Sequence, residues 1–354
     1  MQDRLDAACR AITPLDQTVL DAAWDHINQL TKPLGSLGKL EEIAARLAAI
    51  QGGASPIEAY PARFFTIAGD HGVVAEGINS TPQIVTRQQI HNFLNGGGGI
   101  NALCTAAGAE LFIVDAGVKG EEFAPHPMLI RARVAEGTAN LAVEPAMTQE
   151  QCLAALTLGM DLAEDAVKAG CRTLGAGEMG IGNTTPSAAL FCAFLGADPA
   201  EMTGPGAGVP PIGLEGKTRV IKKALATHAE TIASGDPLAI LAALGGLEIA
   251  AMAGVFLGGA AAKRAVIIDG FIATAAFAAA RAFAPHVADY CFFAHRSGEN
   301  GHTKALELLG QDPYLNFGFR LGEGTGAALF MPLLRSAASV YNTMGTFASA
   351  GVVL

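Results

Sequence analysis

Short apolar segments that end in an acid or a glycine constrain the fold of this chain more than any other feature of it. Most of these segments are followed, directly or after a loop, by an alanine-rich stretch with helical spacing. Buried strands that alternate with helices are typical of a parallel sheet with helices on both faces. We therefore predict an α/β fold, with strands within residues 64–72, 110–117, 171–178, 264–270 and 290–298.

The two ends of the chain show a helical pattern instead. Residues 15–30, 40–50 and 327–344 carry the apolar spacing of helices. We expect both ends to pack together as a small helical lobe, formed by residues 1–58 and 327–354. Residues 59–326 would then form the larger α/β domain that binds ligands.

Composition excludes several classes of protein. Of the 354 residues, 51% are hydrophobic and 16% are charged, so the chain can bury a large core and is not disordered. The net charge of −10, without a lysine cluster, argues against a nucleic-acid partner. Glycines and Glu248 interrupt the longest apolar stretch, residues 238–262, so we expect no membrane span. The first thirty residues lack the apolar core of a signal peptide, and we expect a cytoplasmic protein.

Polar side chains follow the predicted strands. In parallel α/β sheets, ligands bind outside the carboxyl ends of the strands. We therefore expect a polar cleft formed by the residues at those ends, which are Asp70, His71, Asp115, Glu178, Asp269, His295 and Arg296.

The glycine-rich segment GAGEMGIGNTTP, residues 175–186, carries four glycines within eight residues and then Asn183 and Thr184 before an apolar helix. Such a loop directs backbone N–H groups and a helix N-terminus at an anion, which predicts a phosphate site. An ordinary strand-to-helix turn is the alternative. The spacing matches neither GxGxxG nor GxxxxGK[ST], which argues against dinucleotide and ATP sites.

Two further segments offer contacts to an anion. Lys217 follows the loop GPGAGVPP and can supply a cation, although a lysine near a helix start is more often a solvated surface charge. Ser297 and Gly298 offer a hydroxyl and a backbone N–H group after a predicted strand, or they form an ordinary polar turn.

Glu323 lies in the segment FRLGEGTGAAL, between Gly322 and Gly324. The glycines let the backbone approach a ligand closely, and a carboxylate so placed suits a general base. The alternative is an acid at the N-terminus of the following helix, where the helix dipole favours negative charge.

The histidines and cysteines predict no metal site. His71, His295 and His302 lack HxxxH or HxH spacing, and the six cysteines form no CxxC pair. We expect these histidines to be hydrogen-bonded structural residues. A Gx[SC]xG nucleophile motif is also missing from the sequence, which argues against the common hydrolases.

Seven segments together resemble the nicotinate-nucleotide-dimethylbenzimidazole phosphoribosyltransferase family. In chain order they are TKPLGSLGKLEEIA, AGDHGVVAEG with PQIVT, GAGEMGIGNTT, LGGLEIAAMAG, IIDGFIAT, HRSGENGH and LGEGTGAAL, within residues 31–334. The resemblance implies a Rossmann-like large domain with a small helical lobe, a homodimer, and no metal or organic cofactor. It also implies transfer of the 5-phosphoribosyl group from nicotinate mononucleotide to 5,6-dimethylbenzimidazole. The products would be α-ribazole 5′-phosphate, used for the cobalamin lower ligand, and nicotinate.

The resemblance further implies roles for individual residues. Glu323 would be the catalytic base, and Ser80 and Gln88 match the base-binding residues in type. The nucleotide and its phosphate would be held by Glu178, Gly180, Asn183, Thr184, Lys217, Ser297 and Gly298. Many relatives carry an aromatic residue just before the proline, where this chain has Thr81 before Pro82. The identity of the accepted base therefore stays open.

Two other function classes stay open on sequence grounds. A dinucleotide-dependent oxidoreductase would need a glycine fingerprint directly after a strand and an acid about 20 residues later, which residues 175–182 do not offer. A non-catalytic small-molecule-binding protein would lack the base, and Glu323 is present. Among transferases, a diphosphate donor would call for paired acids at a strand end, so the sequence favours a mononucleotide donor.

Overall fold

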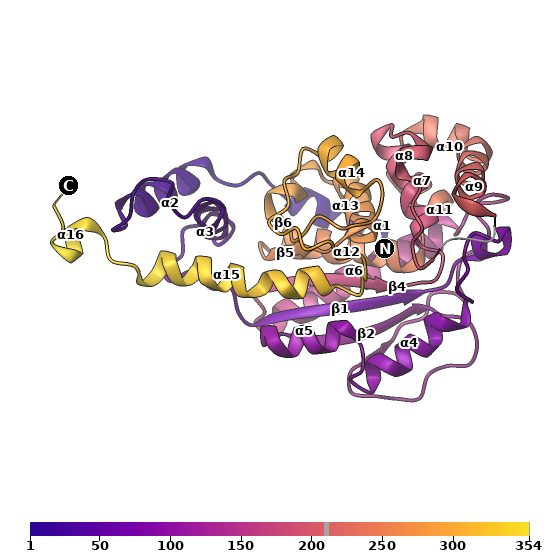
Figure 1. Ribbon diagram of the computed structural model, residues 1–354, viewed down its shortest axis with the longest axis horizontal. Helices are drawn as coiled ribbons and strands as arrows, with labels where there is room; N and C mark the ends of the chain where they lie inside the picture. The colour runs from indigo at the N-terminus through magenta and orange to yellow at the C-terminus, as the bar shows by residue number, and fades with distance from the viewer. Residues whose placement is uncertain (209–211, 354) are drawn as a thin grey trace.

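A computed structural model describes residues 1–208 and 212–353. Its sheet has six strands in the order β3-β2-β1-β4-β5-β6, and all neighbouring strands are parallel (Figure 1). The strands are β1 (Ala62–Gly69), β2 (Glu110–Gly117), β3 (Leu129–Arg131), β4 (Thr173–Met179), β5 (Ala265–Ile268) and β6 (Cys291–Phe293). This order is that of the Rossmann fold, so the predicted fold class is confirmed.

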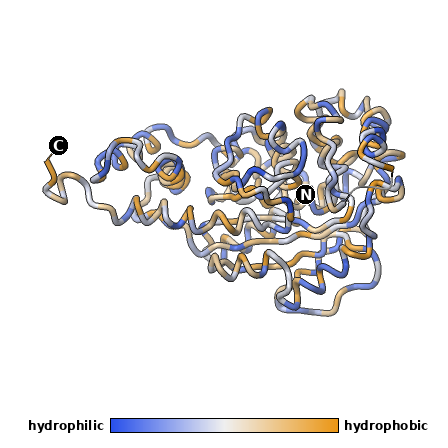
Figure 2. Tube along the Cα trace, in the orientation of Figure 1, coloured by the Kyte–Doolittle hydropathy of each residue, from blue (hydrophilic) through white to orange (hydrophobic). Residues whose placement is uncertain are grey.

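Helices lie on both faces of the sheet (Figure 1). The helices α4 (Ile84–Leu94) and α5 (Gly99–Ala107) join β1 to β2 on one face. On the other face, α12 (Leu247–Ala261) packs against α6 (Gln149–Lys168) and α13 (Phe271–Phe283). Hydrophobic residues run through the sheet and these inner helices, whereas outer helices such as α9 (Gly213–Thr227) carry a hydrophilic side (Figure 2).

The remaining elements complete the layers and the two ends of the chain. They are α1 (Gln2–Ala11), α2 (Gln17–Gln29), α3 (Lys39–Ile50), α7 (Thr184–Leu195), α8 (Pro199–Met202), α9 (Gly213–Thr227), α10 (Ala229–Ser234), α11 (Pro237–Leu244), α14 (His302–Leu309), α15 (Thr325–Thr343), α16 (Phe347–Ala350) and the short 3-10 helices η1 (Gly72–Glu76) and η2 (Pro285–Tyr290). None of the described helices is both long enough and apolar enough to cross a membrane.

The predicted terminal helices coincide with α2, α3 and α15 to within about two residues at each end. α3 packs against both α2 and α15, at the end of the molecule where Figure 1 marks the C-terminus. α1 instead contacts α6 and α12 on the large sheet. The division into a small lobe and an α/β domain stays a prediction.

The strand order reverses between β1 and β4. β2 and β3 lie on one side of β1, and the chain then returns through α6 to place β4 on its other side. Loops that leave the two central strands therefore diverge, and in open parallel sheets ligands bind in the crevice at this point. The fold thus directs attention to the loops after β1, β4 and β5.

Candidate active site

A cavity of about 120 Å³, called the central cavity here, opens at the carboxyl ends of β4 and β5. Its walls come from the loop after β4, the turn after β5, the segment after β6 and residues 320–322. The predicted residues on its wall are Glu178, Gly180, Asn183, Thr184, Asp269, His295 and Ser297. The glycine-rich loop and the serine, far apart in the sequence, therefore face the same space.

The glycine-rich loop lies directly over the end of β1. A Cβ on Gly180 would come 3.2 Å from His71 Nε2 and still closer to the Gly69 carbonyl oxygen, at 2.5 Å, so the loop needs glycine at this position. Ile181 N donates to Thr86 Oγ1 of α4 at 3.1 Å, which anchors the loop from the other side. The helix α7 begins at Thr184, so its N-terminus lies at the cavity wall, an arrangement that favours an anion.

Lys217 lies on α9, behind Thr184. Its Nζ donates to Thr184 Oγ1 at 2.8 Å and to the Gly204 carbonyl at 2.9 Å, and its side chain is buried. It is therefore not the solvated surface lysine that the sequence left open. Burial lowers the pKa of Lys217 to about 8, and the charge of Glu299 opposes that shift.

Glu178 is buried at the end of β4, and one of its carboxyl oxygens accepts a short hydrogen bond from Asn183 Nδ2. Burial raises the pKa of Glu178 to about 8, with further contributions from the charges of Glu248, Asp269 and Glu323, while the Asn183 bond lowers it. Most molecules therefore carry a neutral carboxyl here at pH 7. A neutral group in this wall does not repel an anion.

Ser297 is oriented by a buried histidine. Ser297 N donates to His302 Nδ1 at 2.8 Å, and His302 Nε2 lies 2.9 Å from Thr274 Oγ1. Burial lowers the pKa of His302 to about 3, with smaller contributions from His295 and Arg296. The ring is therefore neutral with its proton on Nε2, which donates to Thr274. This confirms the expected structural role for His302.

Gly298, next along the chain, does not line the central cavity. Its N–H group donates to the Phe319 carbonyl at 2.7 Å. This bond ties the segment after β6 to the segment that leads to Glu323. The N–H group of Gly298 is therefore engaged within the protein and does not face the central cavity.

Glu323 has a left-handed backbone, with φ of +65°. This conformation costs a residue with a Cβ about 1 to 2 kcal/mol, so its surroundings must hold it. Its carbonyl accepts from Thr66 Oγ1 at 2.8 Å, and the next N–H group, of Gly324, donates to Asp269 Oδ2 at 3.1 Å. The backbone of Glu323 and Gly324 packs directly against Gly177 of β4, where a Cβ would clash with it.

The carboxylate of Glu323 points to α5. Glu323 Oε2 accepts from Ile100 N at 3.1 Å, in the first turn of α5, and the side chain is buried. The carboxylate therefore lies at the N-terminus of α5 and not at that of α15. Burial raises the pKa of Glu323, the N–H groups of Ile100 and Gly99 lower it, and Asp269 raises it further.

A second, more open and mostly apolar cavity adjoins Glu323. Its wall includes Ala102 and Leu103 of α5 and Phe319, and it shares Arg320 and Leu321 with the central cavity. A Cβ on Gly99, also in its wall, would come 3.3 Å from Glu323 Oε2. The glutamate thus lies beside the place where a polar and an apolar cavity meet.

Ser80 and Gln88 are exposed, and neither lines one of these two cavities. Both lie on segments that reach the wall of the central cavity. Thr81 Oγ1 donates to the Ala207 carbonyl at 3.1 Å, and Thr86 accepts from the glycine-rich loop. The structure brings these two predicted residues near the site without placing them in it.

Glu299 and Arg320 line the central cavity but were not among the residues that the sequence predicted for the site, and Asp269, predicted only as a strand-end residue of the cleft, lines it too. Asp269 accepts from Gly324 N and Ala327 N and so fixes the start of α15, and Glu299 accepts from Gly206 N at 3.0 Å. The signal was available, because Asp269 and Glu299 lie in the quoted segments IIDGFIAT and HRSGENGH, and Arg320 precedes LGEGTGAAL.

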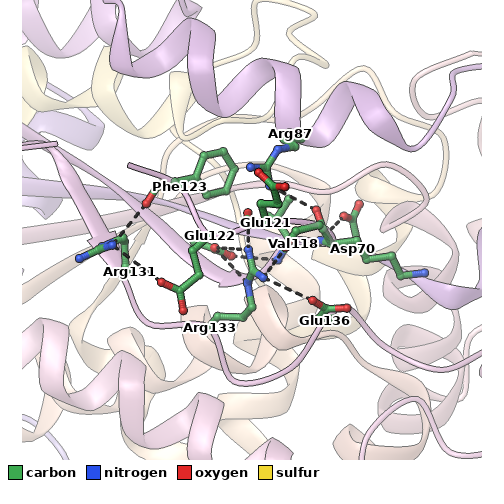
Figure 3. A network of polar contacts seen from close by, with 12 residues as sticks. Asp70, Arg87, Val118, Glu121, Glu122, Phe123, Arg131, Arg133 and Glu136 are labelled. Atoms are coloured by element: carbon green, nitrogen blue, oxygen red, sulfur yellow. Dashed lines mark hydrogen bonds and ion pairs between the residues drawn. The ribbon is translucent and has the colours of Figure 1, made fainter. Parts of the chain in front are cut away.

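A separate network of polar contacts includes Asp70 and Arg133 (Figure 3), and two other predicted strand-end acids belong to it. Asp115 Oδ2 accepts from Arg133 Nη2 at 3.2 Å, and its Oδ1 accepts from Val118 N at 2.9 Å. Asp70 Oδ2 accepts from Lys119 N at 2.9 Å. These acids fix the long connection after β2 and do not line the central cavity.

His71 is also structural. Its Nε2 lies 2.7 Å from Glu248 Oε1 beneath Gly180, and both side chains are fully buried. Within residues 1–208 and 212–353, no group of three or more histidines, cysteines and acids is placed to hold a metal ion.

Comparison with known proteins gives one consistent result. Residues 12–352 match the family model DBI_PRT, described as a phosphoribosyltransferase. The chain is 56% identical over 348 residues to a nicotinate-nucleotide--dimethylbenzimidazole phosphoribosyltransferase of Solidesulfovibrio magneticus, covering 98% of both chains. The protein of the same name from Oleidesulfovibrio alaskensis is 55% identical over 352 residues, covering 99% of this chain and 98% of that one.

Solved structures agree. A crystal structure of CobT from Thermus thermophilus superposes with a TM-score of 0.90 at 45% identity, covering 95% of this chain and 99% of that chain. These whole-length matches leave no room for an oxidoreductase on the same fold. The chain belongs to the nicotinate-nucleotide-dimethylbenzimidazole phosphoribosyltransferase family.

Proposed function

We propose that this protein transfers the 5-phosphoribosyl group of nicotinate mononucleotide to 5,6-dimethylbenzimidazole, giving α-ribazole 5′-phosphate and nicotinate. The observation that carries the proposal is the whole-length identity to relatives that bear this activity in their names. The pairing of a polar cavity with an apolar one beside a buried glutamate supports it chemically.

The central cavity suits the phosphoribosyl group. The N-terminus of α7, with Thr184 held by Lys217 and with Ser297 on the facing wall, offers N–H groups, hydroxyls and a nearby cation for the phosphate. Asn183 and the neutral carboxyl of Glu178 add donors without adding a charge that repels the phosphate.

Glu323 suits the role of general base. Nicotinate leaves C1′ with the electron pair of the broken C–N bond, as a pyridine that needs no proton. The benzimidazole nitrogen attacks C1′ from the opposite face, which turns the β-nucleotide into the α-product. The acceptor's N–H proton then passes to the Glu323 carboxylate, whose raised pKa makes it a stronger base than a solvated glutamate.

The negative charge of Glu323 has a second effect. Positive charge develops at C1′ as the glycosidic bond lengthens, and a buried carboxylate nearby stabilises it more strongly than it would in water. In this proposal Ser80 and Gln88 contact the acceptor base from the segments that border the site. A homodimer and a cytoplasmic location belong to the same proposal and are supported by the family resemblance.

The test is to incubate the purified protein with nicotinate mononucleotide and a panel of bases that includes 5,6-dimethylbenzimidazole, other benzimidazoles, a purine and a phenol. Chromatography and NMR of the products then resolve α- from β-nucleotides. We expect α-ribazole 5′-phosphate and an equal amount of nicotinate. If no base in the panel yields an α-nucleotide, the proposed function is wrong.

A further inference from the structure

Thr66 carries a buried hydroxyl in a strand whose only other polar side chain is that of Arg63, near the start of the strand. It lies in the middle of β1, in the segment ARFFTIAG, and its side chain is fully buried. A buried hydroxyl without a partner is costly, so strands of this kind ordinarily carry valine or isoleucine at such a position. The partner of Thr66 is the backbone carbonyl of Glu323, at 2.8 Å.

The neighbouring position of the sheet is occupied by a glycine. Thr66 of β1 pairs with Gly177 of β4, so the two residues lie side by side across the strands. The backbone of Glu323 and Gly324 lies so close to Gly177 that a Cβ there would clash with it. The short threonine and the bare glycine thus form a slot in the sheet, and the segment that carries the glutamate lies in this slot.

The slot determines the direction of the Glu323 side chain. The backbone of Glu323 is left-handed, and its carbonyl and the following N–H group are fixed by Thr66 and Asp269, respectively. The two bonds hold the single peptide unit between Glu323 and Gly324 at both of its polar atoms. With this unit held and the backbone of Glu323 left-handed, the side chain points toward Ile100 at the start of α5. Loss of one of these two bonds lets a disfavoured backbone conformation relax and moves the carboxylate.

We propose that Thr66 is a positioning residue for the general base, because its hydroxyl holds the Glu323 peptide in the conformation that directs the carboxylate to the reacting acceptor. The proposal rests on the function proposed above for Glu323. Thr66 itself lines neither the central nor the apolar cavity and touches no substrate.

The chain offers a matched control. Thr173 of β4 is equally buried, and its Oγ1 donates to the Ala59 carbonyl at the same distance of 2.8 Å. It lies at the opposite, amino end of the sheet, at the first residue of β4. A substitution there removes the same kind of bond from the same kind of environment without touching the glutamate.

The experiment compares Thr66→Val, Thr66→Ser and Thr173→Val with the wild type. Valine keeps the branched shape and removes the hydroxyl. For Thr66→Val we expect kcat to fall about 10- to 100-fold, as a displaced catalytic group would cause, while the KM for nicotinate mononucleotide stays within about twofold. Thr66→Ser restores most of kcat, and Thr173→Val keeps kcat within about twofold although its Tm falls as far as that of Thr66→Val.

A second measurement does not depend on activity. In protein labelled with ¹³C at the glutamate carboxyl groups, the Glu323 resonance is identified by its loss in Glu323→Gln. We expect its chemical shift and its titration midpoint to move in Thr66→Val and to stay in place in Thr173→Val. If Thr66→Val does not fold, Thr66→Ala replaces it in both measurements.

Three results would overturn the inference: an unchanged kcat in Thr66→Val, an equal loss of kcat in Thr173→Val, or a loss in Thr66→Ser as large as in Thr66→Val. An unmoved Glu323 resonance would do so as well. These outcomes differ from failure of the proposed function, in which the wild type itself forms no α-nucleotide, and the NMR comparison tests Thr66 even then.

Discussion

The acids at the carboxyl edge of the sheet form two groups with similar positions and different surroundings. Asp70 and Asp115, after β1 and within β2, accept from backbone N–H groups and, for Asp115, from Arg133 (Figure 3). Glu178 and Glu323, at the end of β4 and before α15, lie at or beside the two cavities, and burial raises the pKa of both. Burial raises the pKa of Asp70 as well, although the Lys119 N–H group opposes that shift, so the groups differ in what surrounds them and not in burial alone.

The difference shows that position at a strand end does not by itself make an acid functional. In the first group each carboxylate accepts from a backbone N–H group, fixes a long connection and lines neither the central nor the apolar cavity, so it is held apart from a ligand bound there. In the second group burial and neighbouring acids raise the pKa of each carboxyl at or beside a cavity, which suits the group to exchange a proton with a ligand. The predictions below test this division.

The largest expected effect is that of Glu323→Gln. The amide can still accept from Ile100 N but cannot take the proton, so we expect kcat to fall by roughly two to four orders of magnitude with little change in Tm. Asp115→Asn is the control from the other group. It weakens the pair with Arg133 and lowers stability by about 1 to 3 kcal/mol while kcat stays near the wild-type value. Steady-state kinetics and a melting curve for each variant check both statements, and a normal kcat in Glu323→Gln would remove the glutamate from the reaction.

Next in size is the effect of Lys217→Ala on nucleotide binding. A charge-assisted bond contributes about 1.5 to 3 kcal/mol, so the KM for nicotinate mononucleotide rises roughly 10- to 100-fold while that for the base changes little. Lys222→Ala, an exposed lysine on the same helix, leaves both constants unchanged. Because the pKa of Lys217 is about 8, the lysine loses its charge above pH 8, and the wild-type KM for the nucleotide rises there. In Lys217→Ala the KM for the nucleotide does not show this increase. Equal changes in both KM values would place the lysine outside the phosphate site.

A smaller effect concerns stability and pH. Glu178 has a pKa of about 8 in the folded protein and about 4.5 when solvated, so between these values the folded state binds more protons than the unfolded state. Stability contributed by this proton is therefore lost as the pH rises from about 4.5 through about 8. Glu178→Gln removes the loss, and its Tm relative to the wild type should be higher at pH 8.5 than at pH 5. Thermal melts at both pH values measure this, and a parallel pair of curves would contradict the raised pKa.

The smallest expected effect is that of chelation. Asp70, Asp115 and Glu178 accept hydrogen bonds from protein donors. The described residues offer no cluster of three or more side chains that could hold a metal ion. We therefore expect kcat to be unchanged after treatment with EDTA and dialysis. A loss that Mg²⁺ restores would instead indicate a metal held jointly by the protein and the donor phosphate.

The sequence predicted the fold well, because its strands are continuous apolar runs and its helices carry a clear period. β3 escaped prediction, since it has three residues and one of them, Arg131, is exposed. Chemistry alone made the glycine-rich loop and Ser297 separate candidates for an anion contact, the family resemblance assigned them to one phosphate, and both line the central cavity. Gly298 donates elsewhere, and Ser80 and Gln88 line neither cavity.

What the sequence could not give was the partner of each polar group. Asp70 and Glu178 look alike as acids after apolar strands, and their different surroundings depend on Lys119, Asn183 and Glu248, which come from separate parts of the chain. The same holds for Glu323, whose carboxylate caps a helix more than two hundred residues before it in the sequence. Such contacts follow from the topology, in which β4 returns beside β1.

The bare face of β4 at Gly177 has a consequence for attempts to change which base this protein accepts. The glutamate-bearing segment and the glycine-rich loop are both built on this one strand, one against its face and the other at its end. Their separation is thus set by backbone packed against backbone, and substitutions that leave Gly177 and the Thr66 and Asp269 contacts of this segment in place do not alter it. Libraries that randomise residues 80–88 and the apolar cavity can therefore explore new acceptors at a fixed reaction geometry, whereas any residue other than glycine at position 177 would be lost from every active clone.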